Sequence, residues 1–375
     1  MADITIREVT SPRDLYEFIV FPNRLYKNEK YYVPYLISER KKFFDRAQNP
    51  FFLHSEARYF LASRNGKTVG RIAGIINNNH NKFHEDKTGF FGFLDCEDNP
   101  QTASALLDTA IDYVKAAGMN IIRGPMNFST NDEIGFLVDG FDQYPMIMMP
   151  YNPPYYTSLC ENIGLKKAED VNALYIDDAK PPAERIQQLV QKMRQRQNIK
   201  IRSINMDDFE NELELVRFIY NSAWSKNWGF VPMTPEEFQH MADDFKKIIE
   251  PRMVFLAFVN DEPAGFSLAL PDYNVIFKTM NGRLFPIGAL KFFYYTKMKR
   301  IIHSARIITL GIVHKYHNLG LDMMLFLETF NVGSGLGYHW GELSWILERN
   351  MLMNKAATQM GAKLYKTYRI YEKAI

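Results

Sequence analysis

The sequence predicts an α/β chain of the α+β type that is built from two similar folds in tandem. Its 375 residues exceed what one ordinary core holds and suit two domains. Of these residues 46% are apolar and 14% are aromatic, which is enough material to bury two cores. A weak internal repeat supports the same division, because Ile6-Arg7 recurs as Ile201-Arg202 and Gly70 recurs as Gly265, each at an offset of 195 residues.

Charge and composition exclude several classes of protein. The chain carries 45 basic and 43 acidic side chains, so no nucleic-acid partner is expected. Cys96 and Cys160 stand without metal-ligand spacing, which predicts no metal site, no disulfide framework and a reducing compartment. Charged residues throughout positions 1–20 exclude a signal peptide, and no apolar run is long enough to span a bilayer. We therefore expect a cytoplasmic protein.

The first half is expected to contain a strand, a helix, a hairpin, a strand, a helix and a strand, in that order. The hairpin turns at Asn65-Gly66, because this pair tolerates the positive φ of a tight turn. The elements are a strand at 4–9, a helix from Ser11, strands on either side of the turn, a strand at 89–96, a helix at 100–117 and a strand at 121–123.

The second half repeats this order after a charged helix. Its strand at 199–205 leads into a helix from Met206, and its hairpin turns at Asn260-Asp261. A strand at 305–313, a helix at 319–330 and a strand at 341–347 follow. We predict an N-terminal domain at 1–180, a linker helix at 181–198 and a C-terminal domain at 199–375.

Two stretches near the end of the chain, taken with the order of strands and helices, are similar to the sequence pattern of a known family. Residues 310–322 read LGIVHKYHNLGLD, and residues 342–350 read ELSWILERN, with Gly361 eleven residues after Asn350. Together with the order of elements they resemble the GNAT acyltransferase superfamily, in which a strand enters a helix through Arg/Gln-x-x-Gly-x-Gly/Ala. Residues 365–373 also resemble a set of uncharacterised bacterial proteins. The resemblance implies two GNAT-like folds, each with a mixed, mostly antiparallel sheet flanked by helices.

The resemblance also implies an acyl-donor site in the second half. A glycine beside a helix N-terminus lets backbone N–H groups approach a phosphate, and the helix dipole favours the negative charge. In the family this loop holds the pyrophosphate of coenzyme A, so the expected co-substrate is acetyl-CoA or a longer acyl-CoA. The expected donor-binding residues are Ile312, Val313, Lys315, His317, Asn318, Gly320 and Asn350. The N–H groups near Ile312 and Val313 would polarise the thioester carbonyl.

The sequence departs from the family pattern at three positions. Asp322 stands where the family has Gly or Ala, and His317 replaces Arg or Gln. Ala357 occupies the place of a tyrosine that protonates the leaving thiolate in many members. In the first half the equivalent loop at 95–100 has three acids and no glycine, so a phosphate there would meet like charge. We expect the N-terminal copy to be degenerate.

Glu342 and Glu348 are the candidate general bases, since a carboxylate beside an apolar cleft can take a proton from an amine. The irregular segment 123–156 is rich in Asn, Gly, Pro, Met and Tyr, and such loops often carry function. It is expected either to line an acceptor pocket or to pack a domain interface. The candidate substrate-binding residues are Asn127, Asn131, Tyr151, Tyr156 and, in the second half, Trp224.

Residues 271–303 are an apparent insertion in the second half. The segment contains six basic residues and a single acidic one, Asp272, and aromatic residues are interleaved with the basic ones. The segment is expected to be helical from about Gly288. It is either a contact for a membrane surface or an acidic carrier protein, or a packed helix with a solvated basic face.

Three hypotheses follow for function. The first is an N-acyltransferase that moves an acyl group from acyl-CoA or acyl carrier protein to a small-molecule or peptide amine. The second is a GNAT-like protein that binds a ligand without catalysis, which the departures at Asp322 and Ala357 favour. The third is a peripheral membrane acyltransferase that acts on a lipid or cell-wall precursor. A membrane surface is the less favoured partner. The acceptor, the acyl length and the oligomeric state stay open.

Overall fold

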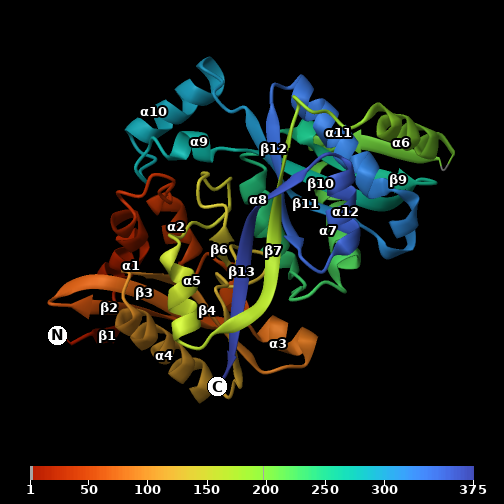
Figure 1. Ribbon diagram of the computed structural model, residues 1–375. Helices are drawn as coiled ribbons and strands as arrows, with labels where there is room; N and C mark the ends of the chain where they lie inside the picture. The colour runs from red at the N-terminus through yellow and green to blue at the C-terminus, as the bar shows by residue number, and fades with distance from the viewer. Residues whose placement is uncertain (1–2, 197) are drawn as a thin grey trace. The chain divides into compact units, whose positions relative to one another are not determined.

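A computed structural model describes residues 3–196 and 198–375 and divides into two compact units (Figure 1). Unit 1 comprises Met1–Asp170, Asn274–Lys299 and Thr367–Ile375, and unit 2 comprises Val171–Tyr273 and Arg300–Lys366. These units are sets of mutual contacts and not consecutive stretches of chain, so the predicted domain boundaries stay a prediction.

Unit 1 is a mostly antiparallel sheet with helices. Its first strands pair in sequence order from β1 to β4, all antiparallel, and β4 then pairs with β5 in parallel. Strands β5 and β6 both pair with β13. The strands are β1 (Thr5–Glu8), β2 (Glu56–Arg64), β3 (Lys67–Ile76), β4 (Thr88–Cys96), β5 (Ile121–Gly124), β6 (Phe136–Asp139) and parts of β7 (Lys166–Asp177) and β13 (Lys363–Ala374). The helices are α1 (Pro12–Leu25), α2 (Ile37–Phe43), α3 (Asn78–His84), α4 (Pro100–Ala116), α5 (Tyr155–Asn162), α9 (Asn274–Phe277) and α10 (Ile287–Phe293), with short helical turns at Pro50–Leu53 and Tyr294–Met298.

The sequence signals of unit 1 act where they were expected. The Ser11 side chain accepts the backbone N–H of Asp14 and starts α1. Asn65 and Gly66 both have positive φ and close the β2–β3 hairpin. Helix α4 packs closely on the sheet, because a Cβ on Gly70 would lie 2.6 Å from a methyl of Leu106. Burial of each such leucine contributes about 1.5–3 kcal/mol.

Unit 2 repeats this architecture. Strands β8 to β11 pair antiparallel in sequence order, β11 pairs with β12 in parallel, and β12 pairs antiparallel with β7. The strands are β8 (Ile199–Ser203), β9 (Val254–Val259), β10 (Glu262–Pro271), β11 (Ser304–Ile312) and β12 (Trp340–Leu347), with parts of β7 and β13. The helices are α6 (Glu184–Arg196), α7 (Phe209–Trp224), α8 (Pro235–Phe245), α11 (Leu321–Gly335) and α12 (Met351–Gln359), with short turns at Met206–Asp208, Pro251–Met253 and His314–Leu319. The predicted end of the helix at 330 was wrong, because α11 continues through Gly333 to Gly335.

Each unit completes its sheet with a strand from the other half of the sequence. In unit 1, Tyr371–Ala374 of β13 pairs with Ile121–Gly124 of β5. In unit 2, residues 171–177 of β7 pair with β12, so that Asp177 stands opposite Trp340. The two halves of the sequence therefore exchange strands, which the repeat along the sequence does not reveal.

The predicted fold class is confirmed. Both units have a mixed, mostly antiparallel sheet flanked by helices, and in each the described parallel pair joins the strands on either side of a long helix. None of the described helices is both long and apolar enough to cross a lipid bilayer.

Candidate active site

Strands β11 and β12 of unit 2 separate partway along their length. Their parallel pairing ends at Ile307 and Leu343, although β11 runs on to Ile312 and β12 to Leu347. On the other side of β11, Ala269 pairs with Ile307 and Leu268 pairs with Thr309, so Ile308 is an extra residue in the ladder. Such a bulge bends its strand and releases local pairing. The result is a gap between two strand edges in the middle of the unit.

A buried ion pair lies beside the start of this gap. Arg306 and Glu342 are cross-strand neighbours, 2% and 0% exposed, with Arg306 Nε 3.5 Å from Glu342 Oε1. Arg306 Nε also donates to Ser344 Oγ at 2.7 Å, and the Ser344 hydroxyl donates to Glu342. A carboxylate in this setting stays in place because each of its oxygens has a hydrogen-bond donor.

The second oxygen of Glu342 is reached by Tyr365, at the start of β13. The Tyr365 hydroxyl donates to Glu342 Oε2, and the Tyr365 side chain is half-buried, whereas the carboxylate is fully buried. Tyr175 stands opposite Glu342 in the β7–β12 ladder, and its ring centroid lies 6.1 Å from that of Tyr365. Tyr365 is therefore the accessible end of a chain that runs through Glu342 to Arg306.

Trp224, a predicted substrate-binding residue, lies against β11. A Cβ built on Gly311 would be 2.1 Å from its indole ring, so the indole packs directly on the strand backbone. The ring stacks on Tyr220, with 4.8 Å between centroids, and lies 5.7 Å from Phe266. Gly311 and Arg306 lie on the same face of the sheet, as their partners Phe266 and Leu270 on β10 show. Trp224 thus covers the face that carries the Arg306–Glu342 pair.

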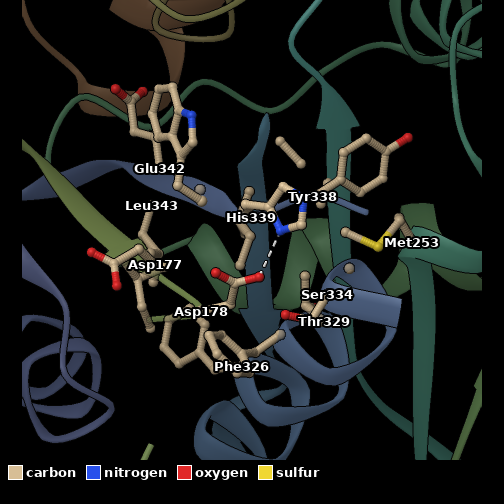
Figure 2. Close-up of a pocket in the computed structure, with 18 of the residues that line it drawn as sticks. Asp177, Asp178, Met253, Phe326, Thr329, Ser334, Tyr338, His339, Glu342 and Leu343 are labelled. Atoms are coloured by element: carbon tan, nitrogen blue, oxygen red, sulfur yellow. Dashed lines mark hydrogen bonds and ion pairs between the residues drawn. The ribbon is translucent and has the colours of Figure 1, made fainter. Parts of the chain in front are cut away.

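The opposite face of the sheet carries a cavity. It measures about 560 Å³ with its open mouth, and it lies between α11 and the paired ends of β11 and β12. Its walls are mainly apolar and include Met253, Ala305, Ile307, Phe326, Phe330 and Leu343. Figure 2 shows Met253, Phe326 and Leu343 around it, and the His339–Asp178 pair, joined at 2.8 Å. Most of that volume is open solvent at the mouth, and the enclosed part is only about 60 Å³, so the cavity is a shallow apolar hollow.

The predicted donor loop forms the turn between β11 and α11. Gly320 has a φ of +70° and precedes the first residue of α11, so the helix begins at Leu321 and not at 319 as predicted. Its Cα is closely approached by Met193 of α6, because an added Cβ would lie 2.4 Å from the Met193 methyl. Asn318 is exposed in the same turn. The loop thus presents the start of a helix, with α6 packed over it.

The polar groups of this loop already have partners within unit 2. The Lys315 ammonium pairs with Glu262, which raises the pKa of Lys315. The ring of His317 donates to the Ile312 carbonyl at 2.9 Å, and the Val313 N–H donates to Ala264 at 2.8 Å. The Val313 N–H is therefore used in a hydrogen bond to β10. It could polarise a thioester carbonyl only if this hydrogen bond were broken.

Asp322 lies at the positive end of α11. Its carboxylate accepts the backbone N–H of Met323, and burial raises its pKa above the ordinary value. A carboxylate there occupies the place that a bound phosphate would take at a helix N-terminus. A pyrophosphate that bound at this end would have to displace it.

Asn350 and Glu348 follow the end of β12. The Asn350 side chain accepts the Met353 N–H at 3.2 Å and caps α12, which accounts for its position without a ligand. Glu348 is half-buried in the turn before α12. The roles of Asn350 in donor binding and of Glu348 as a general base stay predictions, as do those of the other predicted site residues.

In unit 1 the equivalent space is closed by the chain itself. Strands β4 and β5 pair only through Phe90, and the Met126 N–H then donates to the Phe91 carbonyl at 2.8 Å. The Asn127 side chain accepts the Phe93 N–H at 2.8 Å and donates to Glu133 at 2.9 Å. Asn127, predicted to bind substrate, is therefore a bridge that fills the gap between the strands.

The other predicted pocket residues of segment 123–156 also serve unit 1. Tyr156 is fully buried in the core, and its hydroxyl lies 2.6 Å from that of Tyr26. The Tyr151 hydroxyl donates to Glu29 at 2.9 Å, and the Asn131 N–H donates to Ser129 at 3.0 Å. The buried position of Tyr156 places it in the core of unit 1 itself, so it belongs neither to a pocket wall nor to a domain interface.

Sequence reasoning missed Arg306, Ser344 and Tyr365. One signal was present, because Arg306 interrupts the apolar strand at 305–313, and a charge in a buried strand requires a buried partner. Tyr365 carried no signal, since its contact with Glu342 joins two strands that are separated by a helix.

The two units have the GNAT fold in tandem. A scan of known protein families gives no matching model. The chain can be superposed on a tandem GNAT protein from the clavulanic acid biosynthesis pathway, with a TM-score of 0.58, 9% identity and coverage of 99% of this chain and 98% of that one. A GCN5-related N-acetyltransferase from Sphaerobacter thermophilus gives a TM-score of 0.53 at 13% identity, with coverage of 99% and 95%. These likenesses show the fold.

Two relatives are similar in sequence over their full length. Bacterial ceramide synthase of Caulobacter vibrioides is 35% identical over 100% of this chain and 98% of its own length. Protein YghO of Escherichia coli is 34% identical over 99% of this chain and 95% of its own length. The chain belongs to the family of bacterial ceramide synthase and YghO.

Proposed function

We propose that unit 2 is an N-acyltransferase that moves a long acyl chain from an acyl thioester to the amine of a long-chain base. The observation that carries the proposal is the gap between β11 and β12, with a Tyr365–Glu342–Arg306 chain on one face and an apolar cavity on the other. The family relationship to a ceramide synthase supports it, because a ceramide is the N-acyl product of a sphingoid base. The GNAT fold favours acyl-CoA as the donor.

The reaction is a direct attack of the amine on the thioester carbonyl. The C–N bond forms and the C–S bond breaks, and the leaving thiolate takes up a proton from solvent. The amine loses its proton to the Tyr365 oxygen, while the Tyr365 hydroxyl passes its own proton to Glu342, and Glu342 returns this proton to solvent through Tyr365 after the product leaves. Glu342 is fully buried, so Tyr365 and not Glu342 is the group that meets the substrate. Arg306 stabilises the carboxylate before the transfer.

We assign the acyl chain to the apolar hollow and to the open space at its mouth. Ile307 and Leu343 line it, and the same two residues are the last pair before the strands separate. An acyl chain that leaves the gap on the α11 side therefore contacts mainly apolar side chains, and no hydrogen bonds to water are lost when these side chains are covered. Unit 1 is not assigned this reaction, because Asn127 bridges its equivalent gap.

The direct test combines purified protein, palmitoyl-CoA and sphinganine. We expect one N-acyl product, identified by mass spectrometry, for each free thiol that is released. Acetyl-CoA and a short soluble amine serve as the comparison, and we expect slower turnover with both. If no combination, including acyl carrier protein as donor, gives a product, the proposal is wrong.

A variant in α11 tests the cavity. Gly333 lines it, and an added Cβ would meet only the end of the flexible Met253 side chain, whose methyl lies at 3.2 Å and sulfur at 3.7 Å. Gly333→Leu should fill part of the cavity and lower kcat/KM for palmitoyl-CoA about tenfold or more, with little change for acetyl-CoA. The control is Gly335→Leu, two residues further along, where an added Cβ meets nothing within 4 Å. Equal losses for both acyl lengths would contradict the assignment of the cavity.

A non-catalytic binding protein is the second candidate. Asp322 at the start of α11 and the pairing of Lys315 with Glu262 favour it, since both oppose a bound pyrophosphate. It predicts that long-chain amines bind to the protein, measured by calorimetry, without release of thiol from any acyl donor.

A further inference from the structure

Helix α10 and the helical turn after it, both in unit 1, carry a row of exposed apolar side chains. These side chains are 61–74% exposed, whereas residues of this size are ordinarily covered in a core. They are Ile287, Leu290, Phe293 and Met298, together with Phe285 just before α10.

The spacing of these residues places them on one side of a helix. Ile287, Leu290 and Tyr294 follow each other at intervals of three and four, and Met298 follows after four more. Residues with this spacing form a single stripe along a helix. Tyr294 is 40% exposed, so the stripe is open along its whole length.

The side that faces unit 1 is firmly packed. Met280 and Gly288 are buried, and the Lys291 ammonium donates to the Thr279 carbonyl at 2.7 Å. The Asn274 amide donates to the Pro145 carbonyl at 2.9 Å. The exposed stripe therefore belongs to a helix that already has its core contacts, and it needs another explanation.

The charges around the stripe are basic. Arg283, Lys297 and Lys299 are exposed, and between positions 271 and 303 the sequence has one acidic residue, Asp272, which is buried. Exposed aromatic and aliphatic side chains flanked by lysines are the composition of helices that lie in the plane of a membrane surface. Basic side chains near such a helix are attracted to anionic lipid headgroups.

We propose that this stripe docks unit 1 on an anionic lipid bilayer, with the apolar side chains inserted among the headgroups and the three basic side chains against them. The sequence left open a packed helix with a solvated basic face, and the outward-facing apolar side chains favour the membrane surface between the two alternatives. The inference goes beyond the proposed function and does not rest on it, since binding is measured without turnover.

The test is sedimentation with vesicles made of equal parts phosphatidylglycerol and phosphatidylcholine. The wild-type protein should sediment with them at low salt. Leu290→Ser/Phe293→Ser should weaken binding about tenfold or more. The matched control is Leu53→Ser/Phe218→Ser, which removes two apolar side chains that are 72% and 56% exposed elsewhere, and it should bind as the wild type does. Circular dichroism and thermal unfolding verify that all variants are folded.

A second variant separates charge from insertion. Lys297→Gln/Lys299→Gln should weaken binding to the anionic vesicles and reduce its sensitivity to salt, while leaving binding to pure phosphatidylcholine unchanged. Recovery of the wild-type protein in the supernatant at low salt would overturn the proposal. A second result would also overturn it. If acyl carrier protein binds the wild type but not the Leu290→Ser/Phe293→Ser variant, and neither the wild type nor the variant sediments with vesicles, the stripe is a protein-binding surface.

Discussion

Tyr365→Phe should lower kcat for N-acyl transfer about a hundredfold or more and leave KM for both substrates nearly unchanged. The change removes one oxygen that donates to Glu342 at the accessible end of the buried chain, and a positioned acid or base contributes about 10²–10⁴ to the rate of such a reaction. The phenyl ring keeps the place of the phenol, so the protein should still fold, but Glu342 Oε2 loses its donor and the free energy of unfolding should fall by about 1–3 kcal/mol. Steady-state kinetics with palmitoyl-CoA and sphinganine provide the measurement.

The control for this variant is Tyr175→Phe. Tyr175 stands opposite Glu342 on the neighbouring strand and has a comparable ring, but the Glu342 oxygens accept from Ser344 and Tyr365. Its kcat should stay within a few-fold of the wild type. A Tyr365→Phe enzyme of ordinary kcat would show that the proton leaves by another route.

Arg306→Leu should produce the largest loss of stability among single substitutions in the site. Arg306 is 2% exposed and its partner Glu342 is 0% exposed, so the change leaves a buried carboxylate without its cation. Breaking one side of a buried pair costs about 3–5 kcal/mol. Urea unfolding followed by fluorescence should show a lower midpoint with an unchanged slope.

Two further variants serve as controls for this experiment. Arg306→Leu/Glu342→Leu should recover much of the lost stability, because the pair is then replaced by apolar side chains. Arg217→Leu removes an exposed pair with Glu214 on α7 and should cost about 1 kcal/mol or less. If Arg306→Leu is no worse than Arg217→Leu, the buried pair does not hold this part of the sheet.

Local signals in the sequence predicted much of each unit. Turns such as Asn65-Gly66 and caps such as Ser11 depend on a few adjacent residues, and both lie where expected. The helix predicted at 319–330 exists, but it begins two residues later, after Gly320, and ends five residues later, at Gly335. Its end was missed because glycines near a helix end can also continue the helix when packing outweighs their entropy.

The candidate site was predicted only in part, because its residues meet through the sheet. Glu342 was recognised as a carboxylate near the gap, but its partners Arg306 and Tyr365 lie on other strands. Asn127 was chosen for its polar side chain, and only the structure shows that both ends of its amide are bonded inside unit 1. Pairing between distant strands leaves no periodic trace in a single sequence.

The exchange of strands also sets the timing of folding during synthesis. Unit 1 contains Thr367–Ile375, whose strand pairs with β5, although most of the unit is made before residue 171. A ribosome must therefore translate nearly two hundred further codons, which encode all of unit 2 and the Asn274–Lys299 segment of unit 1, before the first sheet can close. Until then the free edge of β5 is exposed to other nascent chains, a hazard for which cells employ chaperones.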